Sequence, residues 1–587
     1  MNNLEISKIL RNVAAAYTIK DEKKFRFQII AYHRASEIIA NLPTEIRDII
    51  TDNKLNAING IGSSLRSHIE ELVKTGTVKQ FEWLFDEISQ AIFPLLDIQS
   101  FGPKKASKLV NYFELKNPDT VVDDILNFAK NGKIEDIPTF GKKSQKDIIR
   151  SIDEFRDKKG KIIKMILPFA LEIAEQIILY IKKCPSTIRV TALGSLRRMT
   201  STVGDIDIAV ATDNPDKVIK HFVSYPYKER IIEQGSTTAS ILTSGGKQID
   251  LMTQPLNSYG SLLQHFTGSK NHNIKLREYA LKKGYSLSEY GIKNKNGEKK
   301  IFTEEEEFYK FIGLQWVPPE IREDKGEIEL AIKNQLPNLV TLDDIKGDLH
   351  IHSNYPIEPS HDLGKNTMQD MINKANELGY EYLGFSEHNP SVSRHTKNQT
   401  YSILARRNEA IEQLKESNKN IRILNLLELD ILSSGELAID EKSLELVDAV
   451  LISIHSSFGM QKDIMTKRIL NGFSHPKAKI FSHPTGRLLN ERNGYDVNFE
   501  KLFLFSKDNN KALEINGSIK RLDLPDIIIK EAISHGVKMI INTDSHDVSQ
   551  MNQMRYGVSV ARRGWAESKD ILNTLNYDNF IKWIKNK

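Results

Sequence analysis

The C-terminal part of the chain repeats one pattern, in which a short apolar strand ends near a His, Glu or Asp and is followed by a helical segment. The strands of this pattern, from about residue 346 onward, are GDLHIH, YLGFSEH, ILNLLELD, AVLISIH, KIFSHP, ALEIN and MIINTDSH. Strands that alternate with helices pair in parallel, so the polar residues at their carboxyl ends meet at one edge. The sequence therefore predicts a (β/α) barrel with a site at its C-terminal face.

The residue types at these strand ends are those that bind metal ions. His350 and His352 are two apart on a strand and point to the same side, and Asp544 and His546 form a second such pair. Ten of the 15 histidines lie from His350 onward. Imidazole and carboxylate without thiolate suit Mn²⁺, Zn²⁺ or Fe²⁺, and the candidates exceed the needs of one ion. The other candidates are His388, Glu428, His455 and His483.

A different pattern occupies the middle of the chain, in the segment GSLRRMTSTVGDIDIAVAT. Asp205 and Asp207 are two apart on a predicted strand and share a face, where their charges repel unless a cation lies between them. Two Mg²⁺ ions are the usual solution, and Asp250, on a predicted β-hairpin, is a candidate third ligand. The turn at Gly194-Ser195 and the fork-shaped cation of Arg198 suit triphosphate oxygens.

The N-terminal third is helical and contains three similar hairpins, whose glycines at positions 62, 102 and 141 are 40 and 39 residues apart. Each copy predicts a helix, a tight turn and a second helix, where backbone N–H groups approach a phosphate without reading sequence. Ser100 and Thr139 replace the first hairpin glycine of the second and third copies. The three repeats look like helix-hairpin-helix elements, and this resemblance implies DNA contacts at Gly60, Gly62, Gly102, Lys104, Gly141 and Lys142.

The middle segment resembles the palm motif of family-X DNA polymerases of the DNA polymerase β type. The motif stands here as Gly194-Ser195, Arg197-Arg198 and Gly204-Asp205-Ile206-Asp207. The resemblance implies that Asp205, Asp207 and Asp250 bind two Mg²⁺, and that Asp250 helps to take the proton of the primer 3′-OH. It also implies that the incoming triphosphate is contacted by Gly194, Ser195, Arg198 and Gly204.

A second motif of this family, Phe-Thr-Gly-Ser followed by Asn, appears in HFTGSKNHN and is continued by SEYG. By resemblance, Phe266 and Gly268 flank the nucleotide sugar and Asn273 reaches the base edge. Three positions depart from the family pattern, with His265 in place of a tyrosine, Lys270 in place of an aspartate and Gln248 in place of an arginine.

Polymerase β-like N-terminal domains are also known for a lyase that removes 5′-deoxyribose phosphate through a lysine Schiff base. Matching the hairpin GIGSSLRSHIEEL to that family puts His68 at the position of the lysine. The chemistry needs a primary amine, and imidazole does not form the stable iminium. We therefore expect no efficient lyase by this route.

The C-terminal pattern looks like the polymerase and histidinol phosphatase (PHP) domain, a barrel with a trinuclear metal site. The matching segments are GDLHIHS, SIHSSF, HPTGRLL, LEIN and TDSH. The ninth ligand implied is Asp362, with Glu358 and His361 as competitors. The implied mechanism is metal-assisted phosphoester hydrolysis, which predicts a Mn²⁺-stimulated nuclease at DNA 3′ ends. The other implied ligands are His350, His352, His388, Glu428, His455, His483, Asp544 and His546.

Composition agrees with several ordinary globular domains. The chain has 587 residues, of which 40% are hydrophobic and 27% charged, and its one cysteine, Cys184, excludes internal disulfides and thiolate metal clusters. A formal charge of +5 does not identify a nucleic-acid binder, so any basic surface is local. We expect no signal peptide, no apolar run of the roughly 18 residues that span a bilayer, and a cytoplasmic, nucleoid-associated monomer.

The expected architecture is multidomain α/β, and the resemblances cover nearly the whole chain. They imply a template-directed gap-filling DNA polymerase of repair, with gapped or nicked DNA and dNTPs as partners, fused to a 3′–5′ exonuclease or phosphoesterase. Mg²⁺ is implied in the palm, and three Mn²⁺ or Zn²⁺ ions in the barrel. The expected parts are an N-terminal helical DNA-binding domain (1–85), a fingers-like helix-hairpin-helix region (86–155), a nucleotidyltransferase palm (156–255), a thumb (256–318), a linker (319–345) and the PHP domain (346–587).

Two alternatives stay open. The first is a small-molecule phosphatase, of the histidinol phosphatase type, with a vestigial polymerase segment, although the intact Asp205, Asp207 and Asp250 argue against it. The second is a DNA-binding scaffold without catalysis, which metal-dependent extension of a gapped primer would exclude.

Overall fold

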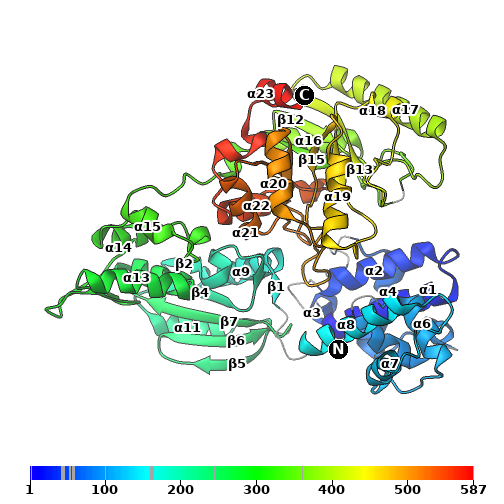
Figure 1. Cartoon of the computed structure of the whole chain (residues 1–587). Helices are drawn as coiled ribbons and strands as arrows, with labels where there is room; N and C mark the ends of the chain where they lie inside the picture. Colours follow the sequence, from blue (N-terminus) through cyan, green and yellow to red (C-terminus); the bar gives the residue numbers. More distant parts are fainter. Residues whose placement is uncertain are drawn as a thin grey trace. The chain divides into compact units, whose positions relative to one another are not determined.

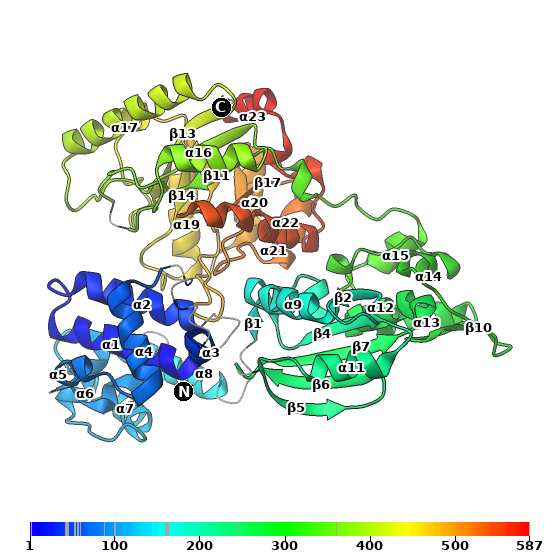
Figure 2. The same cartoon turned by 180° about the vertical axis from the view of Figure 1, so that it is seen from behind.

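The computed structural model describes residues 1–587 except 2, 41–45, 52–54, 56–57, 59, 87, 99–100, 159–163, 244, 360 and 586–587. It is drawn from opposite sides in Figures 1 and 2. The chain divides into two compact units. One comprises residues 1–164, 172–190 and 204–253, and the other comprises residues 165–171, 191–203 and 254–587.

The N-terminal part of the first unit is helical, as the sequence predicts. Its buried side chains form one apolar cluster that runs from Ile6 to Ile152. The long helices α1 and α2 pack closely together and supply much of this cluster. The elements are α1 (Asn3–Asp21), α2 (Arg26–Ala40), α3 (Ile46–Thr51), α4 (Ser63–Thr75), η2 (Lys79–Phe81), α5 (Glu82–Phe85), η3 (Gln90–Asp97), α6 (Pro103–Tyr112), α7 (Val121–Lys130) and α8 (Lys142–Lys158).

A five-stranded sheet follows, with strand order β2-β4-β7-β6-β5. The predicted hairpin is confirmed, because β6 and β7 pair antiparallel and place Ser240 opposite Asp250. Alternation along β7 buries Ile249 and Leu251 on one face and turns Asp250 to the other. The elements of this region are α9 (Leu167–Ile181), β2 (Arg189–Ala192), β4 (Ile206–Ala211), α11 (Pro215–Val223), β5 (Lys228–Gln234), β6 (Thr238–Thr243) and β7 (Gln248–Gln254).

In the second unit, the segment that the sequence predicts as helical from Leu262 to Leu281 forms two helices. The first ends where Gly268 takes a left-handed φ of 70°, and the Ser269 side chain caps the second by accepting from the His272 N–H. The region contains β1 (Met165–Ile166), α10 (Gly194–Arg197), β3 (Thr202–Val203), η4 (Leu256–Ser258), α12 (Tyr259–Thr267), α13 (Lys270–Lys282), β8 (Ser286–Ser288), β9 (Gly291–Lys293), β10 (Lys299–Lys300) and α14 (Glu305–Phe311).

Residues 319–345, the predicted linker, carry short helices that pack onto the preceding domain. Ile321, Ile328 and Leu339 join the same apolar cluster as Leu276 of α13. Glu327 is fully buried and accepts a 2.7 Å hydrogen bond from His272, so this pair also fastens the segment. The elements are η5 (Pro319–Ile321), α15 (Glu327–Ile332) and η6 (Leu342–Asp344).

The C-terminal domain is the predicted barrel of parallel strands. Seven strands pair in sequence order from β11 to β17, and the residues after β17 return to β11, where His352 N–H donates to the Ser545 carbonyl at 2.8 Å. Most strand residues are buried, which is why these strands are nearly continuous apolar runs. The strands are β11 (Gly347–Ile351), β12 (Tyr382–Phe385), β13 (Arg422–Asp430), β14 (Ala449–Ser453), β15 (Ala478–Phe481), β16 (Ala512–Asn516) and β17 (Lys538–Asn542).

Helices follow the strands and cover the barrel (Figures 1 and 2). The last of them, α23, packs Phe580 and Trp583 against the strands. In the described residues, no helix is long and apolar enough to cross a membrane. The helices are α16 (Met368–Glu377), α17 (Lys397–Ser417), α18 (Glu441–Leu444), α19 (Lys462–Phe473), α20 (Phe499–Asp508), α21 (Asp526–Ser534), η7 (Val548–Gln553), α22 (Met554–Arg563), η8 (Ser568–Asp570), η9 (Leu572–Thr574) and α23 (Tyr577–Lys585).

Candidate active sites and nucleic-acid interface

Glu428 is the centre of the histidine cluster at the carboxyl ends of the barrel strands. It is 1% exposed, near the end of β13, and five histidines at the ends of four other strands surround its two oxygens. Side chains alternate between the two faces of a strand, and parallel strands end at the same edge of the barrel. These residues therefore lie together although up to 133 positions separate them in the sequence, from residue 350 to residue 483. The distances from the Glu428 oxygens are 3.2 Å to His350 Nε2, 3.4 Å to His352 Nε2, 3.0 Å to His388 Nδ1, 3.4 Å to His455 Nε2 and 2.8 Å to His483 Nε2.

Two aspartates complete the cluster on the side of His546. Asp544 Oδ1 lies 3.4 Å from His352 Nε2 and 3.8 Å from His546 Nδ1. Asp362 Oδ2 lies 3.5 Å from His546 Nε2, and its other oxygen lies 3.7 Å from His388. The Asp362 side chain is 77% exposed, so it forms the open rim of an otherwise buried site.

The two competitors of Asp362 take different places. Glu358 lies 3.0 Å from His395 and contacts none of the cluster residues that are described here. His361 instead forms a group with His388 and His455 whose ligand atoms lie within 4.8 Å of one another. The structure therefore adds His361 to the cluster alongside Asp362. Its place in an irregular loop gave no strand pattern by which the sequence could assign it.

The cluster suits divalent metal ions because several of its buried nitrogen and oxygen atoms have no hydrogen-bond partner in the described structure. A buried polar atom without a partner is costly. Imidazole nitrogen and carboxylate oxygen suit Mn²⁺, Zn²⁺ or Fe²⁺. Three further overlapping groups offer ligand atoms within 4.8 Å. The unsatisfied atoms are His350 Nε2, His352 Nδ1 and Nε2, Glu428 Oε2, His483 Nδ1 and His546 Nε2.

The electrostatics of the site favour cations. Burial lowers the pKa of His388, but the negative charges of Glu428 and Asp362 outweigh it and raise that pKa to about 10. Burial raises the pKa of Glu428, yet the surrounding histidines hold it well below its usual range. Positive charge is therefore stabilised beside Glu428, and an ion bound there would replace the protons of the imidazoles.

A second layer of carboxylates orients the histidines. Glu514, fully buried on β16, accepts from His350 Nδ1 at 2.7 Å and from the His483 backbone N–H at 2.7 Å. Asp430 bonds His455 Nδ1 at 2.6 Å and His361 Nε2 at 3.2 Å. Such partners fix the ring orientation and the tautomer of a ligand. The sequence offered a hint of Glu514, because it is an acidic residue in the otherwise apolar strand ALEIN.

Glu514→Gln is expected to lower the metal affinity of the cluster by about 10- to 100-fold, because its amide cannot accept from both donors. The check is a competition titration with a metal-binding dye on the full chain. Glu441→Gln is the matched control, since Glu441 also bonds a histidine, His475, at 3.1 Å but lies outside the cluster. Equal affinity for wild-type and Glu514→Gln chains would contradict the assigned role.

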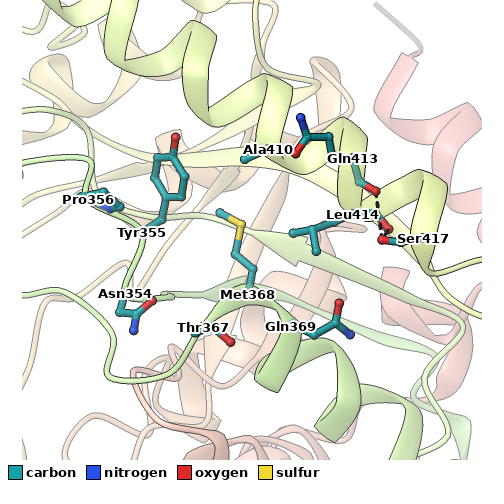
Figure 3. A pocket seen from close by; sticks show the side chains of 10 residues that line it. All are labelled: Asn354, Tyr355, Pro356, Thr367, Met368, Gln369, Ala410, Gln413, Leu414 and Ser417. Atoms are coloured by element: carbon teal, nitrogen blue, oxygen red, sulfur yellow. Dashed lines mark hydrogen bonds between the residues drawn. The ribbon is translucent and has the colours of Figure 1, made fainter.

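An open pocket of about 480 Å³ lies beside the segment that directly follows His352. Its wall combines apolar Tyr355, Met368 and Leu414 with the amide groups of neighbouring residues, as Figure 3 shows. Tyr355 N–H donates to Ser353 Oγ at 3.2 Å, which ties the pocket wall to the residue that directly follows His352. The full lining is Asn354, Tyr355, Pro356, Thr367, Met368, Gln369, Ala410, Gln413, Leu414 and Ser417.

The three palm aspartates lie on the less buried face of the sheet in the first unit. Asp205 is exposed and directly precedes β4, while Asp207 within β4 is half-buried between buried isoleucines. Asp250 is half-buried on β7, which neighbours β4. Ser240 donates to Asp250, and the Gln248 amide donates to both of its oxygens at 3.1 Å. Gln248, which stands where the family has arginine, therefore orients this carboxylate without adding a positive charge.

The Gly-Ser turn and its arginines belong to the second unit. Gly194 has a left-handed φ of 58° and begins the short helix α10, and Ser195 is half-buried. Arg197 does not face a ligand site, because it binds both oxygens of buried Glu305 at 2.9 and 3.1 Å. Arg198 is 13% exposed and donates to the Thr267 carbonyl at 2.6 Å, next to Gly268. Gly204 is exposed, in the first unit.

The second polymerase motif lies at the end of α12 and the start of α13. Phe266 is half-buried, with its ring 4.9 Å from that of His265. The Asn273 amide donates to the His265 carbonyl at 2.7 Å and accepts from Gln264 at 2.9 Å. Asn273 is thus fixed in position by its own helix pair, and part of its surface stays exposed.

Each hairpin glycine directly precedes a helix. Gly62 and Gly102 are the N-caps of α4 and α6, with ordinary extended φ of −72° and −77°, and Gly141 precedes α8. A Cβ atom at any of the three would meet nothing within 4 Å in the described structure. Neither backbone conformation nor internal packing in the described structure requires glycine there, so the approach to these three helix starts is open.

The other hairpin predictions have mixed outcomes. Gly60 does need glycine, with a left-handed φ of 89°. Lys142 is exposed, whereas Lys104 pairs with Glu22 at 2.6 Å on the surface. Thr139 takes a positive φ of 78°, a left-handed backbone conformation that favours glycine, as at Gly60. Ser100 lies outside the described residues.

Comparisons with known proteins identify domains and relatives of the chain. Three family models match: a helix-hairpin-helix domain over residues 1–78, the DNA polymerase beta thumb over residues 262–323 and the PHP domain over residues 348–518. The DNA polymerase/3′-5′ exonuclease PolX of Bacillus subtilis is 32% identical over 588 residues, covering 100% of both chains. The chain belongs to the PolX family.

Membership in the PolX family confirms the predicted combination of a family-X polymerase and a PHP domain in one enzyme. A DNA polymerase lambda of Arabidopsis thaliana is 25% identical over 357 residues, 54% of this chain and 62% of that protein. A probable phosphatase of Clostridium acetobutylicum is 28% identical over 209 residues, 34% of this chain and 78% of that protein. The two halves of this PolX-family chain thus resemble separate groups of proteins.

Proposed function

We propose that the chain fills short gaps in DNA at the palm aspartates and trims DNA 3′ ends at the histidine cluster of the barrel. The observation that carries the proposal is the presence of two different candidate metal sites, three aspartates on the less buried face of a sheet and a cluster of histidines and carboxylates at the strand ends of a barrel. The family models of the polymerase thumb and the PHP domain, and the PolX relative, support these two activities. A DNA substrate would place the protein in the cytoplasm, at the nucleoid.

At the palm, Asp205, Asp207 and Asp250 would hold two Mg²⁺ ions, which would bring the primer 3′-OH to the α-phosphate and stabilise the leaving pyrophosphate. Asp250 is the candidate acceptor for the proton of the 3′-OH. Ser240 and Gln248 fix its orientation by hydrogen bonds, so its carboxylate needs little rearrangement. Gly194, Ser195, Arg198 and Gly204 would contact the triphosphate, while Phe266, Gly268 and Asn273 would face the sugar and base.

At the barrel, the ions would supply an activated hydroxide for attack on phosphorus. The chain would hold them with the residues around Glu428 and orient the imidazoles through Glu514 and Asp430. Asp362 on the exposed rim leaves that side open, which suits entry of a DNA end. The proposed ligands are His350, His352, His361, Asp362, His388, Glu428, His455, His483, Asp544 and His546.

Sequence-independent contact with gapped or nicked DNA would come from the hairpins. The open approach to Gly62, Gly102 and Gly141 lets a phosphate meet backbone N–H groups at helix starts. Exposed Lys142 would add a charge contact, which makes the affinity depend on salt.

The direct test of the polymerase is extension of a one-nucleotide gapped duplex with dNTPs and then with NTPs, in Mg²⁺ or Mn²⁺. The proposal predicts templated addition of a single dNMP. The same assay reports sugar selection, on which His265 and Lys270 depart from the family pattern. Failure to extend in either metal would refute the proposed polymerase.

Two observations favour a second candidate, a phosphatase of small phosphomonoesters. One is the match to a probable phosphatase, and the other is the 480 Å³ pocket beside the segment that follows β11. The rates of the two hydrolysis reactions distinguish the two functions. Faster phosphate release from histidinol phosphate than nucleotide release from DNA 3′ ends would favour the phosphatase, and the reverse supports the nuclease.

Abasic-site lyase activity is expected to be absent. His68 is buried, and both ring nitrogens are engaged, Nδ1 with Tyr32 Oη and Nε2 with Gln80 Oε1, each at 2.7 Å. It therefore serves the packing of the domain and has no amine for a Schiff base. Borohydride trapping of the full chain on DNA with an incised abasic site should yield no covalent adduct, and a strong adduct would contradict this expectation.

A further inference from the structure

The barrel domain reaches the proposed nucleotide site through one buried arginine. Arg563 is the last residue of α22 and is 8% exposed. Its Nη1 donates to the backbone carbonyl of Arg198 at 2.7 Å and to Glu323 Oε1 at 3.1 Å, and its Nη2 donates to Asp526 Oδ2 at 2.8 Å. A single side chain of the PHP domain thus holds both the main chain of Arg198 and the carboxylate beside it.

Glu323 is the link between the two arginines. Its Oε1 also accepts from Arg198 Nε at 3.1 Å, so one carboxylate oxygen serves two guanidinium groups. Arg198 donates its Nη1 to the Thr267 carbonyl, and these two bonds fix the plane of its guanidinium. Because Glu323 is shared, it neutralises Arg198 only in part, and Arg198 keeps positive charge for an anion.

We propose that Arg563 is a positioning residue for Arg198, through which the PHP domain supports binding of the incoming nucleoside triphosphate. The inference rests on the proposed role of Arg198 in contacting that triphosphate. Without Arg563, the Arg198 carbonyl loses this donor, and the Glu323 carboxylate pairs with the Arg198 guanidinium only. Both changes weaken the field that Arg198 offers to a phosphate and loosen its orientation.

The neighbouring Arg562 provides a matched control on the same helix. Its Nε donates to Glu320 at 2.7 Å and its Nη1 to the Val340 carbonyl at 3.0 Å, so it joins the same parts of the chain. Among the described residues, its side chain bonds Glu320 and the carbonyls of Leu339 and Val340, and it does not bond Arg198 or Glu323. A general loosening of the interface should therefore appear in R562A, whereas loss of positioning should appear only in R563A.

The predicted effect is a change in KM for the nucleotide. R563A should raise the KM for dNTP by about three- to tenfold and change kcat less than twofold, because a binding contact is weakened while the catalytic aspartates are untouched. R563K should recover part of the affinity, since it keeps the charge and one donor. R562A should keep the wild-type KM.

The experiment is steady-state gap filling by the full chain, with the dNTP titrated on saturating gapped DNA, for wild type, R563A, R563K, R562A, R198A and R198A/R563A. Thermal unfolding of each chain shows that it is folded at the assay temperature. If Arg563 acts through Arg198, adding R563A to R198A should raise KM less than twofold further.

The outcomes separate the two proposals. An equal rise of KM by R563A with and without Arg198, or a rise in R562A that matches R563A, would overturn the positioning role. A wild-type chain that extends DNA, with a KM unchanged in R198A, would overturn the proposed nucleotide contact of Arg198 and the inference with it. A KM raised in R198A but not in R563A would overturn the inference alone.

Discussion

Replacing Asp207 with asparagine is expected to lower gap filling by about 10³-fold or more and to leave 3′-end trimming within twofold of wild type. Asp207 lies on β4 between buried neighbours, so the substitution keeps the shape of the sheet. It removes one of the three negative charges that would hold Mg²⁺ in the proposed palm site. Metal stabilisation of the transition state supplies several kcal/mol, and a loss of about 4 kcal/mol corresponds to the expected drop.

The measurement is single-turnover extension of a gapped duplex in saturating dNTP and Mg²⁺. Asp213→Asn is the control, because Asp213 is exposed just after the same strand and has no assigned role. A change of less than tenfold for Asp207→Asn would place the metal-binding carboxylates elsewhere. An equal drop in the control would indicate damage to the palm as a whole.

The double variant His350→Ala/His352→Ala is expected to abolish trimming of DNA 3′ ends, by about 10³-fold or more, with gap filling on a matched primer retained. The two rings reach Glu428 and Asp544 from β11, and their unsatisfied nitrogens are the core of the proposed metal cluster. Without them, the remaining groups cannot hold the ion that would activate water.

Trimming is followed as the loss of single nucleotides from a labelled 3′ end in Mn²⁺. His475→Ala is the matched control, since His475 belongs to the same domain but pairs with Glu441 away from the cluster. Full nuclease activity in the double variant would remove the barrel from this reaction. Loss of activity in the control would show sensitivity of the domain to any histidine replacement.

The sequence predicted the main residues of the histidine cluster because their positions follow from strand geometry. Residues two apart on a strand share a face, and parallel strands present their carboxyl ends together, which brings His350, Glu428 and His483 to one place. His361 could not be assigned in this way, because it lies in an irregular loop whose path depends on the folded barrel. The sequence could not assign a role to Glu514, because its hydrogen bond with His350 exists only in the folded barrel.

The predicted linker shows a second kind of contact that the sequence could not predict. Its short helices contain apolar residues at helical spacing, but the buried contact between Glu327 and His272 joins positions 55 residues apart. No local pattern reports such a pair. The same reason hid Glu323 and Arg563, which are separated by 240 residues and meet only in the folded chain.

The central claim is that one chain has two separable active sites, and a single substrate tests it. The substrate is a gapped duplex whose primer ends in a mismatched nucleotide, supplied with dNTPs, Mg²⁺ and Mn²⁺. Wild type should remove the mismatch and then fill the gap, Asp207→Asn should only trim, and His350→Ala/His352→Ala should fill the gap only from a matched primer. Loss of both activities in either variant, or trimming that survives in the histidine variant, would contradict the claim.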